Sequence, residues 1–211
     1  MTFTLKRIDS SRNIWATEMI DYIGIAGRND ISRFLNEEGY SGYGVEIGTH
    51  RGIFAETLIS VWDGTLICVD PWNLAEDYDD QIPLLTGGTD RDSHELEART
   101  RLMPFVESGK CKILKTTSKQ ALSYLPNNTL DFVYVDGNHK YRYVLEDMTN
   151  WWNKIKPGGF LFGHDYIYPG EFSWAHQVQP AVNDFCKSHQ VNHCIIPDGT
   201  DPWSFAIRKP A

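Results

Sequence analysis

The sequence predicts one α/β domain over residues 1–211, with a Rossmann-like, doubly wound, seven-stranded sheet that is mostly parallel and closes with an antiparallel hairpin. Two observations lead to this prediction. From about residue 40, short apolar runs alternate with segments of helical periodicity, which is typical of a parallel sheet with crossover helices. The last two apolar runs stand close enough in the sequence to pair directly as a hairpin.

The elements follow in order. Five strands are expected at 43–48, 65–70, 110–115, 130–136 and 160–165, and the closing pair within 191–197 and 202–210. Helices are expected at 49–62, 118–125, 142–155 and around 178–187. The run Lys156-Pro157-Gly158-Gly159 should stop the helix before it, because Pro and Gly stand where a helix ends.

Two segments lie outside this repeat. Residues 1–40 are expected to form a helical cap on the sheet, notably over 15–27 and 30–38. Residues 73–108 form a lid-like insertion, in which a polar loop precedes a helix at 93–106 with Ser93 as its N-cap. Long loops near the carboxyl end of a strand often cover a site.

Composition excludes several classes of protein. The formal net charge of −8 argues against general affinity for nucleic acid or for an anionic membrane. No apolar run reaches the ~20 residues that span a bilayer, and the N-terminus lacks a signal-peptide core, so a cytoplasmic location is expected. The cluster from Cys186 to Cys194 has zinc-binding residue types, but its spacing matches no common zinc module.

The run "VEIGTHRG" at 45–52 joins the first strand to its helix. Gly48 and Gly52 permit a tight turn, and the helix N-terminus offers unpaired N–H groups to a ligand. The pattern is not the GxGxxG of dinucleotide-binding proteins. Glu46 suits a cationic or hydroxyl-bearing ligand better than a pyrophosphate. The alternative is an ordinary strand-to-helix turn.

Asp70 ends the second strand in "ICVDPW" and follows Gly48 by 22 residues. A carboxylate at this position commonly accepts hydrogen bonds from the hydroxyls of a ribose. The alternative is a turn aspartate that precedes Pro71.

Two more acids end the fourth and fifth strands, Asp136 and Asp165. Neighbouring strands lie about 5 Å apart, so these two carboxylates would repel each other unless a cation or a proton lay between them. Oxygen ligands of this kind suit Mg²⁺. The sequence therefore predicts a divalent metal site where these strands end.

The block "DFVYVDGNHKYRYVLEDMTNWWNKIKPGGFLFGHDY" at 131–166 resembles the small metal-dependent O-methyltransferases among the class I S-adenosylmethionine-dependent methyltransferases. It is similar to the macrocin O-methyltransferase and cephalosporin-hydroxylase-like group, and more distantly to catechol O-methyltransferase. The wider resemblance covers roughly residues 40 to 209. It implies that His139 is the general base and that Ser118 lies near the adenine. The cofactor-binding residues that it implies are Glu46, Gly48, Thr49, His50, Gly52, Asp70, Ser118 and Asp136.

The fifth strand departs from the pattern of these relatives. They usually place two metal-binding side chains in a row, acid–acid or acid–Asn, whereas this chain has His164-Asp165. Imidazole is a poor ligand for Mg²⁺ and a better one for Mn²⁺. The implied metal ligands are therefore Asp136, Asp165 and His164, with Mg²⁺ or Mn²⁺ as the ion. His164 is alternatively a neighbour of the ligands or a packed residue.

The resemblance implies transfer of a methyl group from S-adenosylmethionine to a hydroxyl of a small molecule or carbohydrate. Three alternatives stay open: an S-adenosylmethionine-binding protein without catalysis, a nicotinamide-dependent oxidoreductase and a metal-dependent hydrolase. The missing GxGxxG disfavours the oxidoreductase. Assembly into a homo-oligomer is also left open.

Overall fold

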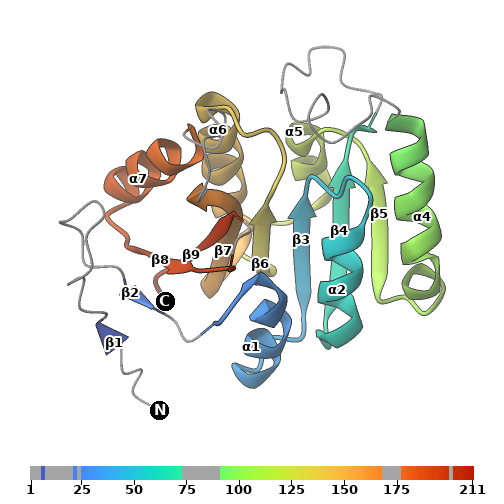
Figure 1. Cartoon of the computed structure of the whole chain (residues 1–211), viewed down its shortest axis with the longest axis horizontal. Helices are drawn as coiled ribbons and strands as arrows, with labels where there is room; N and C mark the ends of the chain where they lie inside the picture. Colours follow the sequence, from blue (N-terminus) through green and yellow to red (C-terminus); the bar gives the residue numbers. More distant parts are fainter. Residues whose placement is uncertain (1–5, 8–20, 23–24, 73–90, 168–176, 200–201) are drawn as a thin grey trace.

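The computed structural model describes residues 6–7, 21–22, 25–72, 91–167, 177–199 and 202–211. One sheet runs through them in the order β1-β2-β8-β9-β7-β6-β3-β4-β5 (Figure 1). Its strands are β1 Lys6–Arg7, β2 Asp21–Tyr22, β3 Tyr43–Ile47, β4 Thr65–Asp70, β5 Cys111–Lys115, β6 Leu130–Val135, β7 Ile155–Ile167, β8 His193–Ile196 and β9 Trp203–Arg208. All seven expected strands are present, and β1 and β2 extend the sheet beyond them.

The pairing confirms the predicted topology. Strands β3 to β7 are mutually parallel. Strand β9 is antiparallel to both β7 and β8, so the closing hairpin forms as expected. The helices are α1 Ile31–Glu37, α2 Ile53–Val61, α4 Arg91–Glu107, α5 Ser118–Ala121, α6 Tyr141–Trp152 and α7 Val178–His189, with 3₁₀ turns η1 Arg28–Asp30 and η3 Leu122–Tyr124. No helix in the described residues is long and apolar enough to cross a membrane.

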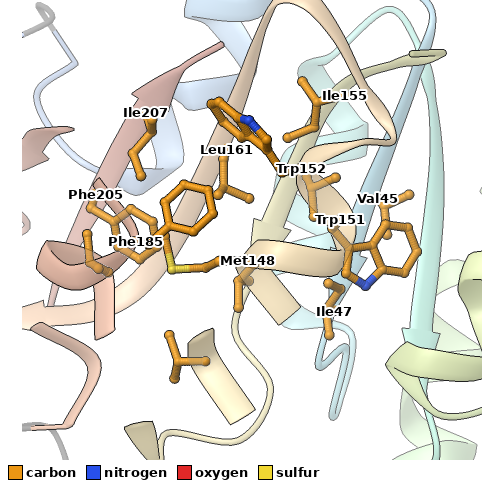
Figure 2. Close-up of a cluster of buried hydrophobic side chains, with 14 of the residues drawn as sticks. Val45, Ile47, Met148, Trp151, Trp152, Ile155, Leu161, Phe185, Phe205 and Ile207 are labelled. Atoms are coloured by element: carbon orange, nitrogen blue, oxygen red, sulfur yellow. The ribbon is translucent and has the colours of Figure 1, made fainter. Parts of the chain in front are cut away.

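Helices cover both faces of the sheet because the strands are apolar on both sides. On one face, Val45 and Ile47 of β3 pack with Met148, Trp151 and other side chains of α6 and α7 (Figure 2). On the other face, alternate strand residues pack against α1, α2 and α4, and these include Leu66, Cys68, Phe132, Tyr134 and Phe162. Two buried layers therefore hold the strands in register from both sides.

The edge strand β5 is paired only with β4 within the described residues. Lys112 is exposed on it, with its Nζ 5.7 Å from the centroid of the Tyr43 ring. Helix α4 packs against β5 and against α2. The insertion after β4 thus returns to the sheet through a helix at its edge (Figure 1).

Three local expectations are corrected. Helix α6 ends at Trp152, and Lys156 to Gly159 lie inside β7 rather than stopping the helix. They stay in the sheet because the backbones of Gly158 and Gly159 pair with Lys209, although Gly158 has a φ of 82° and the pairing with β6 is irregular there. Helix α4 begins at Arg91, so Ser93 is inside the helix and is not its N-cap.

The N-terminal segment is described only in part. Residues 30–38 form the expected helix as α1, whereas Asp21–Tyr22, expected within a helix, is strand β2 and pairs with β8. Most of the remaining cap, and the loop of the expected lid at 73–90, lie outside the described residues. The division into cap, core and lid stays a prediction.

Candidate active site

The carboxyl ends of four neighbouring parallel strands bring four acids to one edge of the sheet. Strands β7, β6, β3 and β4 are adjacent in that order. Glu46 lies in β3 and Asp70 ends β4, while Asp136 follows β6 and Asp165 lies near the end of β7. In sheets of this type, ligands bind beyond the carboxyl ends of the strands.

The turn after β3 needs glycine for a steric reason. Gly48 has a φ of 91°, and a Cβ on it would lie 2.0 Å from the backbone oxygen of Asp136. Gly52 has a φ of 74° and precedes α2, and a Cβ on it would lie 3.1 Å from Cα of Ala98 in α4. The loop at 48–52 is therefore packed closely between the end of β6 and helix α4.

Glu46 is the most unusual acid at this edge. Its residue is 2% exposed, and its Oε2 has no hydrogen-bond partner. Burial raises the pKa of Glu46 to about 8. Thr49, also buried, has an unpartnered Oγ1. Because buried polar atoms are normally paired, these two atoms indicate a polar or cationic ligand at the loop.

Asp70 is held by two backbone donors. Its Oδ2 accepts a hydrogen bond from His50 N at 2.8 Å, and its Oδ1 accepts one from Trp72 N at 2.7 Å. Trp72 Nε1 donates in turn to His50 O at 2.8 Å. Asp70 thus forms the turn that the alternative interpretation predicted, and the same two bonds fix the orientation of its carboxylate at the end of β4; its ribose role stays a prediction.

The ribose role that the resemblance implies for Asp70 makes a testable prediction: the Asp70→Ala variant should bind S-adenosylhomocysteine at least about tenfold more weakly. Isothermal titration calorimetry would measure this. The Asp70→Asn variant keeps one oxygen acceptor and should lose less affinity. Unchanged affinity in the alanine variant would remove the ribose role from Asp70.

The second group of acids surrounds an imidazole. His139 Nε2 lies 2.7 Å from Asp165 Oδ2 and 3.6 Å from Asp136 Oδ1. One ligand atom from each of these three residues lies within 4.8 Å of the others. Among the described residues, this is the group of histidine, cysteine and acid side chains that has such a geometry.

A kink in β7 aims Asp165 at this cluster. In a regular strand His164 and Asp165 would point to opposite faces, but Asp165 has a φ of 58° and the pairing with β9 is irregular between Gly163 and Ile167. His164 Nδ1 consequently lies 3.2 Å from Asp165 Oδ2. Burial opposes ionisation of Asp165, but hydrogen bonds from His139 and His164 outweigh it and hold its pKa well below the usual range.

Arg28 is a site residue that the sequence did not indicate. Its Nη1 donates to His164 Nε2 at 3.1 Å, and its Nε lies 3.8 Å from Asp198 Oδ2. His164 is therefore placed between Arg28 and Asp165, and it is outside the three-residue cluster of possible metal ligands. Arg28 comes from the segment before α1, whose sequence carries no motif that points to the site.

The comparisons with known proteins now decide the family. A sequence family described as a methyltransferase domain matches residues 45–166, which is more than half of the chain. The chain belongs to this methyltransferase family. The resemblance to class I S-adenosylmethionine-dependent methyltransferases is thereby confirmed, and the matched range contains every residue proposed above for cofactor, metal and base.

Solved structures share the fold of this methyltransferase domain. An O-methyltransferase from Bacillus cereus in complex with SAH matches with a TM-score of 0.63 at 12% identity, covering 86% of this chain and 80% of that one. The O-methyltransferase TomG from Streptomyces achromogenes, involved in tomaymycin synthesis and in complex with SAM, matches with a TM-score of 0.60 at 18% identity, covering 86% and 79%.

The sequence relatives of the domain match over shorter stretches. An uncharacterized protein of Acanthamoeba polyphaga mimivirus is 36% identical over 62 residues, which make up 29% of this chain and 26% of the viral protein. The match therefore spans about a quarter of the length of the viral relative. A second relative, an uncharacterized protein from Sinorhizobium fredii, is matched over 6% of its length.

The hydroxyl of Ser118 already makes two hydrogen bonds to other side chains of the methyltransferase domain. It donates to Asp147 Oδ1 in a short hydrogen bond and accepts one from Trp151 Nε1 at 2.8 Å. Burial raises the pKa of Asp147 to about 7. The adenine role of Ser118 stays a prediction, and Asp147 is a neighbour of it that the sequence did not single out.

Proposed function

We propose that this chain transfers a methyl group from S-adenosylmethionine to a hydroxyl oxygen of a small molecule or carbohydrate, assisted by a divalent cation. The observation that carries the proposal is the convergence of Asp136, His139 and Asp165 at the sheet edge. They lie beside a glycine loop with an unpartnered Glu46. The family of the chain supports the reaction type.

The loop after β3 fits the methionine part of the cofactor. Glu46 Oε2 and Thr49 Oγ1 are buried acceptor atoms without partners, and the amino group of the cofactor is a donor with a positive charge. Asp70 offers two oriented oxygens for the ribose. The Bacillus and Streptomyces structures are complexes with SAH and with SAM, which supports the same cofactor here.

Asp136 and Asp165 would hold the cation. Two carboxylates supply the hard oxygen ligands that Mg²⁺ and Mn²⁺ both accept. A bound cation would lower the pKa of the acceptor hydroxyl, which is a weak nucleophile near pH 7.

His139 would accept the proton of that hydroxyl. Its Nε2 lies 2.7 Å from Asp165 Oδ2, so the neutral ring donates its Nε2–H to the carboxylate and has its lone pair on Nδ1. Asp165 would thus fix both the orientation and the tautomer of the base, as a carboxylate does for many catalytic histidines.

The cofactor step of the proposal is tested by binding. Thermal shift and calorimetry with S-adenosylhomocysteine, with NAD and without ligand should show stabilisation by S-adenosylhomocysteine alone. Stabilisation by NAD instead would favour the oxidoreductase, and no stabilisation by either would overturn the cofactor assignment. Release of S-adenosylhomocysteine in the presence of a panel of phenols, sugars and glycosides would separate an enzyme from a binding protein.

The cation is tested by its removal. EDTA should lower methyl transfer at least about tenfold, because the hydroxyl loses its Lewis acid, while affinity for S-adenosylhomocysteine stays nearly constant. Added Mg²⁺ or Mn²⁺ should restore the rate in the wild type and not in the Asp136→Asn variant. Full activity after exhaustive chelation would contradict metal assistance.

A further inference from the structure

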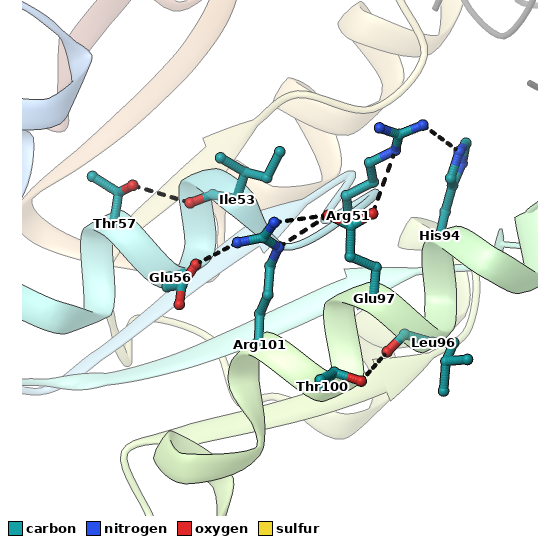
Figure 3. Close-up of polar contacts among 9 residues, drawn as sticks. All are labelled: Arg51, Ile53, Glu56, Thr57, His94, Leu96, Glu97, Thr100 and Arg101. Atoms are coloured by element: carbon teal, nitrogen blue, oxygen red, sulfur yellow. Dashed lines mark hydrogen bonds and ion pairs between the residues drawn. The ribbon is translucent and has the colours of Figure 1, made fainter. Parts of the chain in front are cut away.

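A series of hydrogen bonds connects helix α4 to the loop at 48–52, the cofactor loop, which the proposed function assigns to S-adenosylmethionine. His50 Nε2 lies 3.0 Å from His94 Nδ1, and His94 Nε2 lies 3.1 Å from Arg51 Nη2. Figure 3 shows Arg51 between His94 and Glu97, both on α4. His94 is 5% exposed, whereas His50 lies at the surface of the loop.

In this series of hydrogen bonds, the donor of each bond follows from which atoms carry a proton. A guanidinium has only donors, so Arg51 donates and His94 Nε2 accepts. The proton of a neutral His94 is then on Nδ1 and is donated to His50 Nε2. His50 accepts there, and the proton of its own neutral ring is on Nδ1. The second nitrogen of a histidine is commonly set in this way by the partner of the first.

We propose that His94 is a positioning residue for His50, and that it presents His50 to the bound cofactor as a neutral Nδ1–H donor. This inference rests on the proposed function, because it takes the ligand of the 48–52 loop to be S-adenosylmethionine. Nδ1 of His50 has no hydrogen-bond partner among the described residues.

A neutral ring is what this position requires. S-adenosylmethionine carries a sulfonium cation, and an imidazolium at position 50 would repel it. Arg51 and His94 disfavour a charge on His50, whereas Asp136 and Glu97 favour one. Partial burial of the ring is the largest cause, and together with His94 and Arg51 it lowers the pKa of His50.

The arrangement also links two parts of the chain that the sequence separates. His94 is near the beginning of α4, directly after the insertion loop, and His50 is in the cofactor loop. A change in the position of α4 would therefore alter the donor that His50 presents. Cofactor binding and the placement of α4 thus become coupled through His94, and Arg51 adds a second connection between the loop and α4.

Variants at His94 test this role. His94→Phe removes both hydrogen bonds from a buried position and should weaken binding of S-adenosylhomocysteine by about tenfold. His94→Asn places an amide nitrogen where Nδ1 lies, so it can still donate to His50 and should restore most of the affinity. Isothermal titration calorimetry on the full chain measures all three proteins.

A control variant distinguishes the effect of the hydrogen-bond relay from His94 to His50 from a general effect of how α4 packs on the domain. Arg101 pairs with Glu97 Oε1 at 2.8 Å and with Glu56 Oε2 at 2.9 Å, and so it joins α4 to α2 without contacting His94 (Figure 3). Arg101→Gln should leave affinity within about twofold, because exposed ion pairs contribute little. A loss equal to that of His94→Phe would assign the effect to helix docking and overturn the proposal.

The tautomer provides a readout that does not depend on the cofactor. In ¹⁵N-labelled free protein, the ring nitrogens of His50, assigned by the loss of their signals in His50→Gln, should show a protonated Nδ1 and an unprotonated Nε2. His94→Phe should change this pattern and His94→Asn should keep it. The opposite tautomer, or a pattern unchanged in His94→Phe, would overturn the relay. A wild type that binds no S-adenosylhomocysteine would instead overturn the proposed function and the cofactor role of His50 with it.

Discussion

The His139→Ala variant is expected to transfer methyl groups about 10²–10⁴-fold more slowly than the wild type, because it loses the group that accepts the proton of the acceptor hydroxyl. Its affinity for S-adenosylhomocysteine should change little, since His139 lies with Asp136 and Asp165, the acids proposed to hold the cation. Single-turnover rates and calorimetry on the same preparations would measure the two effects separately.

The matched control is His189→Ala, which removes an imidazole on α7 that contacts Phe185 and Trp152 instead of the acids. It should turn over at nearly the wild-type rate. A fully active His139→Ala variant would exclude this residue as the base. An equal loss in both variants would point to a general loss of folded protein, which circular dichroism would show.

The Glu46→Gln variant is expected to bind S-adenosylhomocysteine about 10²-fold more weakly, as when one partner of a buried charge pair is removed. The free variant should be at least as stable as the wild type at pH 8. The reason is that Glu46 Oε2 is buried without a partner, so its charge costs free energy until a cation binds. Calorimetry and melting temperatures would measure both quantities.

This variant also has a defined pH signature. The pKa of Glu46 is raised from 4.5 to about 8, so between these values the folded protein holds more protons than the unfolded one. The contribution of Glu46 to stability therefore falls as the pH rises through that range. Binding of an ammonium group would release the proton, and affinity should rise with pH until about 8. In Glu46→Gln, neither the stability nor the affinity should show this dependence on pH. A pH-independent affinity in the wild type would contradict the pairing of Glu46 with the ammonium group of the cofactor.

The four acids at the sheet edge were predictable because the signal for each is local. An apolar run that ends in a carboxylate marks the carboxyl end of a strand, as Val135 and Asp136 do. Parallel pairing then brings those ends together. Strand spacing brings the ends of β6 and β7 close together, whereas the kink in β7 turns Asp165 toward Asp136 and His139.

Other parts of the site depend on contacts between segments distant in the sequence. Arg28 meets His164 across 136 positions, from a segment with no repeating pattern. The left-handed backbone of Asp165 is set by its irregular pairing with β9. Lys156 to Gly159 carry a strong helix-stop pattern, but the backbone of Lys209 holds them in the sheet. Tertiary pairing overrides local preference in such cases.

The two ends of the sheet bear on self-association. At one end, the described part of β1 is Lys6–Arg7, which pairs with β2. At the other end, β5 carries the exposed Lys112, and a lysine on an open edge opposes edge-to-edge aggregation. On the described helices, the exposed apolar side chains include Ile53 and Val61 of α2 and Leu96 and Met103 of α4, and these surfaces are better suited to contact another copy than the lysine-bearing strand edge.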